Sequence, residues 1–184
     1  ATLELAAGIP PGTYRLQAEV YDRLTHERLQ AIVAGSDPVQ RVDLGPLVVA
    51  PAAFTPRPED LDIEPREASL VPGLKLLGWR LTPDRAVRFD QGISLNFGWQ
   101  ATDALAEDYA AHVQLLDAEG NAWAEATCMP AGEGYPTSRW QVGEILRYPC
   151  DLHVSAEAPA CSARLELTLV DRMGQAVAAP LTLA

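Results

Sequence analysis

An internal repeat restricts the fold of this chain more than any other feature of its sequence. Residues 1–23 correspond to residues 150–172 at a constant offset of 149 positions. The identical pairs include Pro10 and Pro159, Arg15 and Arg164, Leu16 and Leu165, Asp22 and Asp171, and Arg23 and Arg172. Because the two stretches match over this length, we expect them to adopt the same local structure.

A second matched stretch marks the end of each copy. Residues 44–50 correspond to residues 178–184 at an offset of 134 positions, so the second copy is shorter between its two matched stretches. A period of roughly 115–135 residues is longer than a solenoid repeat and is typical of tandem domains. Since Ala1 aligns with Cys150, well inside the second copy, we expect the first copy to begin part-way through a domain.

The matched stretches have the period of β-strands. Apolar side chains alternate with polar ones, as at Leu16, Ala18 and Val20, which indicates a strand with one buried face. The fifteen prolines and thirteen glycines supply turn signals at short intervals and leave little room for long helices. The expected strands are residues 2–5, 13–21, 28–33, 42–49, 74–81, 92–100, 109–117, 121–128, 144–154, 162–170 and 176–183.

Seven strands in the second copy are typical of an immunoglobulin-like or fibronectin-III-like antiparallel β-sandwich. We therefore predict an all-β protein with one complete copy of this domain and the C-terminal half of a preceding copy. Residues 1–50 would form the truncated copy, and residues 69–184 would form the complete one. Residues 51–68 are rich in proline and acidic side chains, a composition that indicates an extended linker.

The charge of the chain excludes some classes of partner. The formal net charge is −11 and the sequence pI is about 4.6. Nucleic acids and anionic membrane surfaces bind proteins through clustered Lys and Arg. The sequence has no such cluster, so we expect neither as a partner. The longest nearly uncharged apolar run, residues 44–54, is shorter than the ~20 residues that a membrane-spanning helix needs, so we expect no membrane insertion by this segment.

No motif in the sequence predicts catalysis. A nucleophile elbow, a phosphate-binding loop, a dinucleotide-binding loop and a His-Glu-x-x-His zinc motif are all missing from the sequence. The histidines, His26, His112 and His153, are widely separated, and we interpret them as surface or hydrogen-bonded core residues. We therefore expect no enzymatic activity, no catalytic residues and no cofactor.

One acidic segment resembles a calcium loop in part. Asp60, Asp62 and Glu64 alternate with apolar residues, but the segment lacks the glycine and the bidentate glutamate of such a loop. We interpret the segment as solvated and predict no metal site.

Aromatic side chains form the best candidate ligand site. Trp99 lies on an alternating strand with Leu95 and Phe97, so we interpret it as a core residue. Tyr135 and Trp140 lie on a turn-rich segment without strand periodicity, where a sugar or a proline-rich peptide would stack on them. The alternative, that both side chains cover the edge of the domain, stays open.

The three cysteines all fall in the second copy. An odd number in an extracytoplasmic protein predicts one disulfide bond and one free thiol. Cys150 and Cys161 begin consecutive strands, which would separate them by about 20 Å, whereas a disulfide requires Cα atoms about 4.4–6.8 Å apart. We favour a bond between Cys128 and Cys150, with three free thiols as the alternative.

The truncated copy needs a cover for its apolar face. Leaving such a face in water would cost several kcal/mol at about 25 cal/mol per Å². The strands of residues 1–50 would therefore pack on the complete domain or on a second chain in a two-fold homodimer. We expect one of these two arrangements.

Several short motifs resemble those of a known group of proteins. They comprise Gly98-Trp99-Gln100-Ala101, Asp108-Tyr109, residues 112–117, Tyr135-Pro136-Thr137-Ser138-Arg139-Trp140, Gly143-Glu144 and the pattern of residues 14–22. Together they resemble the tandem β-sandwich repeats in extracytoplasmic regions of bacterial polytopic membrane proteins, which themselves resemble lipid-carrier-dependent glycosyltransferases. The second copy departs from the pattern, because Cys161 and Ala163 replace the Gly12 and Tyr14 of the first.

The resemblance implies an extracytoplasmic location as part of a larger membrane protein, and it transfers no catalytic residues. We expect a non-catalytic spacer or protein-interaction module with a protein partner. The alternative is a carbohydrate-binding accessory domain that binds a glycan through Tyr135 and Trp140.

Overall fold

The computed structural model describes residues 4–25, 27–32, 35, 37–52, 55–83 and 92–183. Within these residues the regular structure consists of antiparallel β-sheets and two short 3-10 helices, so the prediction of an all-β fold is confirmed. The chain divides into two compact units. Unit 1 contains residues 1–10 and 52–184, and unit 2 contains residues 11–51.

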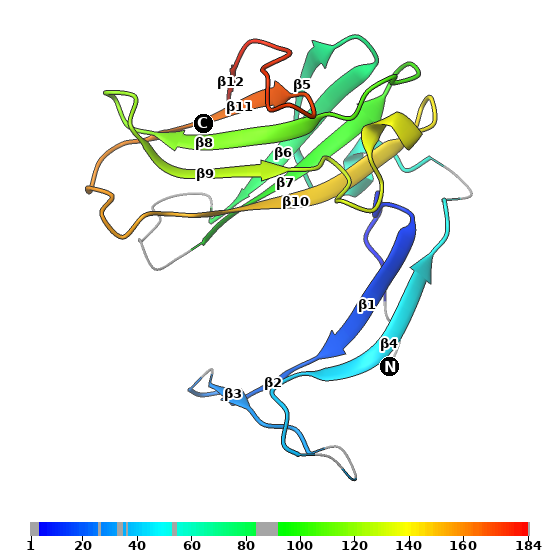
Figure 1. The fold of residues 1–184 in the computed structure, drawn as a ribbon, viewed down its shortest axis with the longest axis vertical. Helices are drawn as coiled ribbons and strands as arrows, with labels where there is room; N and C mark the ends of the chain where they lie inside the picture. Colours follow the sequence, from blue (N-terminus) through cyan, green and yellow to red (C-terminus); the bar gives the residue numbers. More distant parts are fainter. Residues whose placement is uncertain are drawn as a thin grey trace. The chain divides into compact units, whose positions relative to one another are not determined.

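Unit 1 has two four-stranded sheets, shown in Figure 1. The first has the order β10-β7-β6-β5, with β5 at Glu64–Val71, β6 at Leu74–Thr82, β7 at Gly92–Ala101 and β10 at Ile145–His153. The second has the order β12-β11-β8-β9, with β8 at Ala110–Leu116, β9 at Ala122–Cys128, β11 at Arg164–Val170 and β12 at Leu181–Thr182. All strand pairs are antiparallel. The predicted strands between residues 74 and 170 lie close to β6–β11, whereas the strand predicted at 176–183 is only Leu181–Thr182 and β5 was not predicted.

Both sheets contribute to one hydrophobic core. Leu95 and Trp99 come from β7, and Val113 and Leu167 come from β8 and β11, and none of these side chains is exposed. The alternation of apolar residues along β11 therefore selects the buried face, as a period of two requires. Trp99 is a core residue, as its sequence context indicates.

A second, smaller cluster involves part of the segment that was predicted to be a linker. The 3-10 helix η1, Pro58–Leu61, ends in a fully buried leucine that packs with Ile63, Leu77 and Ile145. Residues 64–68 then form the first half of β5 and pair with β6. The predicted linker, residues 51–68, is therefore too long. Two apolar side chains within its acidic run, Leu61 and Ile63, hold the segment on the sheet.

The segment before unit 2 also belongs to unit 1. Ala7 packs against the smaller cluster, and the backbone N–H of Arg147 donates a hydrogen bond to the carbonyl of Gly8 at 2.6 Å. Gly8 has a φ of +78°, and a Cβ atom there would lie 2.7 Å from Leu61. Residues 4 and 5, expected in a strand, have no strand conformation, and residues 2 and 3 lie outside the described residues.

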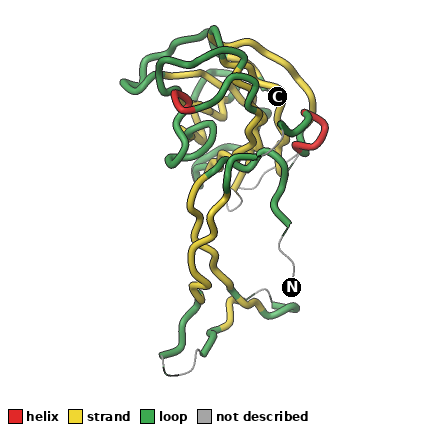
Figure 2. The backbone as a smooth tube through the Cα atoms, turned by 90° about the vertical axis from the view of Figure 1, so that its right-hand side faces the viewer, coloured by secondary structure: helices red, strands yellow, loops and turns green. Residues whose placement is uncertain are grey.

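Unit 2 consists of two strand pairs. The strands β1, Gly12–Ala18, and β4, Val42–Val49, form a twisted two-stranded ribbon, visible in Figure 2. The short strands β2, Val20–Tyr21, and β3, Arg28–Leu29, form the second pair. The predicted strand at residues 28–33 is therefore shorter in the structure, and residue 33 lies outside the described part.

The two stretches that match in sequence have related local structures. β11 aligns with residues 15–21, which lie in β1 and β2, and β12 aligns with residues 47 and 48 of β4. β1 pairs with β4 and β11 pairs with β12, both antiparallel but in different registers. Gln17 lies opposite Asp43, whereas the aligned Glu166 lies opposite Thr182, which aligns with Val48. After each first strand an aligned aspartate, Asp22 or Asp171, accepts a hydrogen bond at 2.8 Å from the backbone N–H two residues later.

Candidate functional site

The candidate site is the partly buried apolar face of the β1–β4 ribbon. The register places Tyr14 opposite Leu47, Leu16 opposite Gly45 and Ala18 opposite Val42, with Val49 opposite Gly12 at the end. Residues directly opposite one another point to the same face. We call this set, Tyr14, Leu16, Ala18, Val42, Leu47 and Val49, the ribbon stripe. Every member is of intermediate burial, whereas a core strand would bury them.

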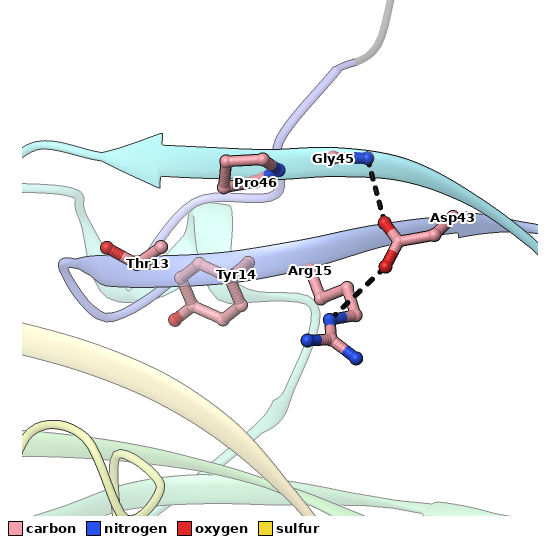
Figure 3. A pocket seen from close by; sticks show the side chains of 6 residues that line it. All are labelled: Thr13, Tyr14, Arg15, Asp43, Gly45 and Pro46. Atoms are coloured by element: carbon pink, nitrogen blue, oxygen red, sulfur yellow. Dashed lines mark hydrogen bonds and ion pairs between the residues drawn. The ribbon is translucent and has the colours of Figure 1, made fainter.

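The other face of the ribbon is polar and exposed. Thr13, Arg15 and Gln17 alternate with the stripe residues of β1. The carboxylate of Asp43 lies 3.5 Å from the guanidinium of Arg15 and accepts the backbone N–H of Gly45 at 2.9 Å. Figure 3 shows these groups beside a hollow that is also lined by Pro46. Exposed pairs of this kind contribute little to stability, so we interpret them as a solvated face.

A bulge sets the twist of the ribbon. The pairing shifts between Leu16 and Gln17, which leaves Leu44 without a position opposite β1. Gly45 has a φ of +102°, a conformation that glycine adopts without strain. Leu44 is 58% exposed as a result, and it is one of several large apolar side chains of unit 2 that face solvent.

An ionic cluster closes the far end of the ribbon. The carboxylate of Glu19 accepts hydrogen bonds from the Tyr21 hydroxyl and the Arg41 guanidinium, and Arg28 lies 3.2 Å away. These donors hold the pKa of Glu19 below its ordinary value. The cluster joins three short segments, and its charges are paired, so we interpret it as structural.

The predicted aromatic site is built differently from a ligand platform. Trp140 is 5% exposed, and its indole N–H donates to the carbonyl of Tyr135 at 3.2 Å. The Tyr135 hydroxyl donates to the Glu144 carboxylate at 3.1 Å, and burial, together with that negative charge, raises the pKa of Tyr135 to about 12. Because the indole is enclosed in the core, Trp140 does not offer a face for stacking, and the expectation of a ligand platform is corrected at this residue.

The loop that carries these aromatics is tied to the body of unit 1. The 3-10 helix η2, Thr137–Arg139, begins with a buried threonine whose hydroxyl donates to the carbonyl of Glu107 at 2.9 Å. The backbone N–H of Ser138 donates to Asp108 at 3.0 Å, and Arg172 also pairs with this carboxylate. Hydrogen bonding holds the pKa of Asp108 below its ordinary value, with the side chain of Ser138 as the main cause, followed by the Ser138 backbone N–H and Arg172.

The structure joins Cys128 and Cys150 by a disulfide bond, with a Cα–Cα distance of 5.6 Å. Cys128 ends β9 and Cys150 lies in β10, so the bond connects the two sheets of unit 1. Cys161 is an exposed free thiol. The sequence favoured this pairing by arguing against a bond between Cys150 and Cys161, but only the fold explains why the end of β9 meets the interior of β10.

The polar residues considered for chemistry do not gather. Asp60 pairs with Arg57, and Asp62 pairs with Arg80. His112 lies 3.0 Å from the Thr127 hydroxyl, and His26 lies outside the described residues. Among the residues that the structure describes, no three potential metal-ligating side chains form a cluster. None of the helical segments in that part of the chain is long or apolar enough to cross a bilayer.

Comparison with known proteins gives no relative for this arrangement. No protein-family model matches the chain, and neither curated proteins nor solved structures match it.

The sequence predicted an apolar face within residues 1–50, but it did not show which residues form the ribbon stripe. The cross-strand register that defines the stripe depends on a bulge at Leu44, which single-sequence periodicity does not reveal.

Proposed function

We propose that this chain is a non-catalytic interaction and spacer module from the extracytoplasmic part of a larger bacterial membrane or surface protein. In this proposal unit 1 is an immunoglobulin-like or fibronectin-III-like β-sandwich, and unit 2 carries strands that correspond in sequence to β11 and β12. The observation that carries the interaction role is the ribbon stripe, an apolar face with strand register that remains partly exposed.

The strand order of unit 1 supports the β-sandwich assignment. In the immunoglobulin arrangement strand B lies beside E, and C lies beside F, which lies beside G. If β6 is taken as strand A, β7 then lies beside β10 as B beside E, and β8, β11 and β12 lie in the order of C, F and G. β9 extends the second sheet beside β8, and β5 is an additional edge strand.

The disulfide bond supports the extracytoplasmic location. Disulfide bonds persist in oxidising compartments and are rare in the reducing cytosol. The bond between Cys128 and Cys150 differs from the antibody pattern, because it joins β9 to β10 and does not join the equivalents of strands B and F. It is therefore a feature of this chain and not a copy of the antibody framework.

The ribbon stripe supports a protein partner. A two-stranded sheet is marginally stable alone, and covering its apolar face with another polypeptide removes that face from water. In the isolated chain we propose that the stripe of a second copy supplies this cover, which gives a homodimer with two stripes packed face to face. The acidic surface of the chain disfavours nucleic acid as the alternative partner.

Sedimentation velocity across a range of protein concentrations tests this role. We expect reversible association that Leu16→Asp weakens by at least about tenfold, because it places a charge within the stripe. The matched control is Val48→Asp on the opposite face of the ribbon, where the side chain is 72% exposed, and it should leave association unchanged. Monomers at every concentration, or equal effects of the two substitutions, would contradict the proposal.

The carbohydrate-binding alternative loses its main support. A stacking platform needs an exposed aromatic face, and Trp140 is enclosed in the core. Tyr135 alone, with its hydroxyl already bonded to Glu144, does not form a comparable site.

A further inference from the structure

The matched strands β11 and β1 have the same alternation of side chains but very different surroundings. Leu165, Leu167 and Leu169 of β11 are 4%, 0% and 0% exposed. At the offset of 149, the corresponding residues are Leu16, Ala18 and Val20, of which the first two are partly exposed and Val20 is 53% exposed. The first copy therefore keeps the side-chain pattern of a central core strand in a place where the described residues provide no such core.

The difference lies in the neighbouring strands. β11 pairs with β12 on one edge and with β8 on the other. β1 pairs with β4, which contains the stretch aligned with β12. Among the described residues, the sheet that contains β1 has only these two strands. The position that β8 occupies beside β11 has no equivalent in that two-stranded sheet.

We propose that the edge of β1 opposite β4 accepts an antiparallel β-strand from another copy of this repeat, with the side-chain pattern of β8. This inference rests on the proposed function and names its partner: a strand with Val and Leu on one face and His and Gln on the other, as in Ala110–Leu116. Strand addition of this kind obtains its affinity from main-chain hydrogen bonds and its specificity from alternate side chains.

The register proposed for the added strand is that of β8 beside β11. In β11 and β8, Leu165 lies opposite Leu115, Glu166 opposite Gln114 and Leu167 opposite Val113. Shifted by 149 positions, Leu16 lies opposite the partner's equivalent of Leu115, and Ala18 lies opposite that of Val113. Gln17, on the polar face, lies opposite the equivalent of Gln114.

This arrangement places apolar partner side chains beside the ribbon stripe, because Leu16 and Ala18 belong to it. The strand would widen the stripe into the inner face of a three-stranded sheet. A face-to-face homodimer of two stripes leaves the edge of β1 open, so the two contacts are compatible.

Register-specific disulfide trapping tests the proposal. The full chain carries Gln17→Cys, with Cys161→Ser to remove the exposed thiol. The probe is a synthetic peptide with the sequence of residues 109–118 in which Cys replaces the residue at position 114, and control peptides carry Cys at position 112 or 116. Mixed disulfides in a glutathione buffer are quantified by mass spectrometry.

We expect the position-114 peptide to form the mixed disulfide about tenfold more than either control. Directly opposite residues have Cβ atoms about 4.5–5.5 Å apart, whereas residues displaced by two positions are about 7–8 Å away. Adding Val48→Asp to the chain should leave this preference unchanged, because its side chain lies on the exposed face of β4.

Equal yields from the three peptides, or no mixed disulfide, would overturn the proposal. A disulfide between two chains through Cys at position 17 would also overturn it, because it would identify β1 of a second copy as the occupant of the edge. Gln17 lies on the face opposite the stripe, so a stripe-to-stripe dimer does not produce that product. Stripe-dependent sedimentation without peptide trapping would leave the proposed function standing while this inference fails.

Discussion

The strands β11 of unit 1 and β1 of unit 2 have a similar alternation of apolar and polar residues but lie in different environments. Both contain an arginine followed by a leucine, at residues 164–165 and 15–16, and both lead to an Asp-Arg turn. Leu165 is buried at 4% exposure between two sheets, whereas Leu16 lies on a two-stranded ribbon and stays partly exposed. The comparison shows that a sequence pattern selects strand and face, while burial depends on which other strands are present.

The two strands should therefore respond differently to the same substitution. Leu165→Ala removes a core side chain, and we expect it to lower the free energy of unfolding by about 3–4 kcal/mol. At protein concentrations where the chain is monomeric, Leu16→Ala should cost less than about 1 kcal/mol, because its side chain is then partly hydrated. Urea unfolding followed by tryptophan fluorescence measures the loss in unit 1, which holds all four tryptophans, and amide hydrogen exchange of residues 12–18 measures the loss in the ribbon. Similar losses in the monomer would show that the ribbon is covered as well as the core of unit 1.

The disulfide bond gives unit 1 a restraint for which the ribbon has no counterpart. Replacing Cys128 and Cys150 with alanine together should lower the free energy of unfolding by about 3 kcal/mol, because it releases a loop of 22 residues in the unfolded chain. Cys161→Ser is the control and should have no effect, since its thiol is exposed and free. Thermal unfolding of oxidised protein provides the measurement, and an equal loss in the control would contradict the assigned bond.

The boundary between the two regions is testable at Gly8. Gly8 and Gly174 have nearly the same φ, +78° and +77°, but only Gly8 has neighbours within reach of a Cβ atom. Gly174→Ala should cost about 1 kcal/mol through backbone strain alone, and Gly8→Ala about 1–2 kcal/mol more through the clash with Leu61. Equal costs would show that residues before unit 2 do not pack on unit 1 as described.

The smallest expected effect concerns pH and compares turns of the two regions. In unit 1, hydrogen bonds from Asn121 and Trp123 lower the pKa of Asp117 to about 2, and in unit 2 the backbone N–H groups of Thr25 and Leu24 lower the pKa of Asp22. A carboxyl group whose pKa is lower in the folded state than in the unfolded state stabilises the fold at pH values above its unfolded pKa. Its contribution to the free energy of unfolding is therefore complete above about pH 4. For Asp117 it is lost as the pH falls toward about 2.

Carboxyl NMR titration of the folded chain measures both groups. We expect Asp117 to titrate near pH 2 and Trp123→Phe to raise that value, because the substitution removes one donor, at 2.8 Å. His112→Gln serves as a control on the same sheet and should leave the Asp117 titration unchanged. An ordinary Asp titration at position 117 would show that its turn is not formed as described.

Much of unit 1 was predictable because strands and turns are specified locally. The predicted strands at 92–100 and 162–170 agree with β7 and β11. The β5 strand was missed, since its proline and acidic residues outweighed the weak alternation of residues 64–71. For the candidate site, the need for a cover was predictable, whereas its members depended on a cross-strand bulge.

The sequence by itself determined most of the strands of unit 1 and which of their faces are apolar, because each of these depends on residues close together in the chain. Only the tertiary structure decided that Trp140 is enclosed, that Cys128 meets Cys150 and that Leu61 returns to the sheet. Those outcomes depend on contacts between distant segments. The same reason explains how the aligned leucines Leu16 and Leu165 occupy such different environments.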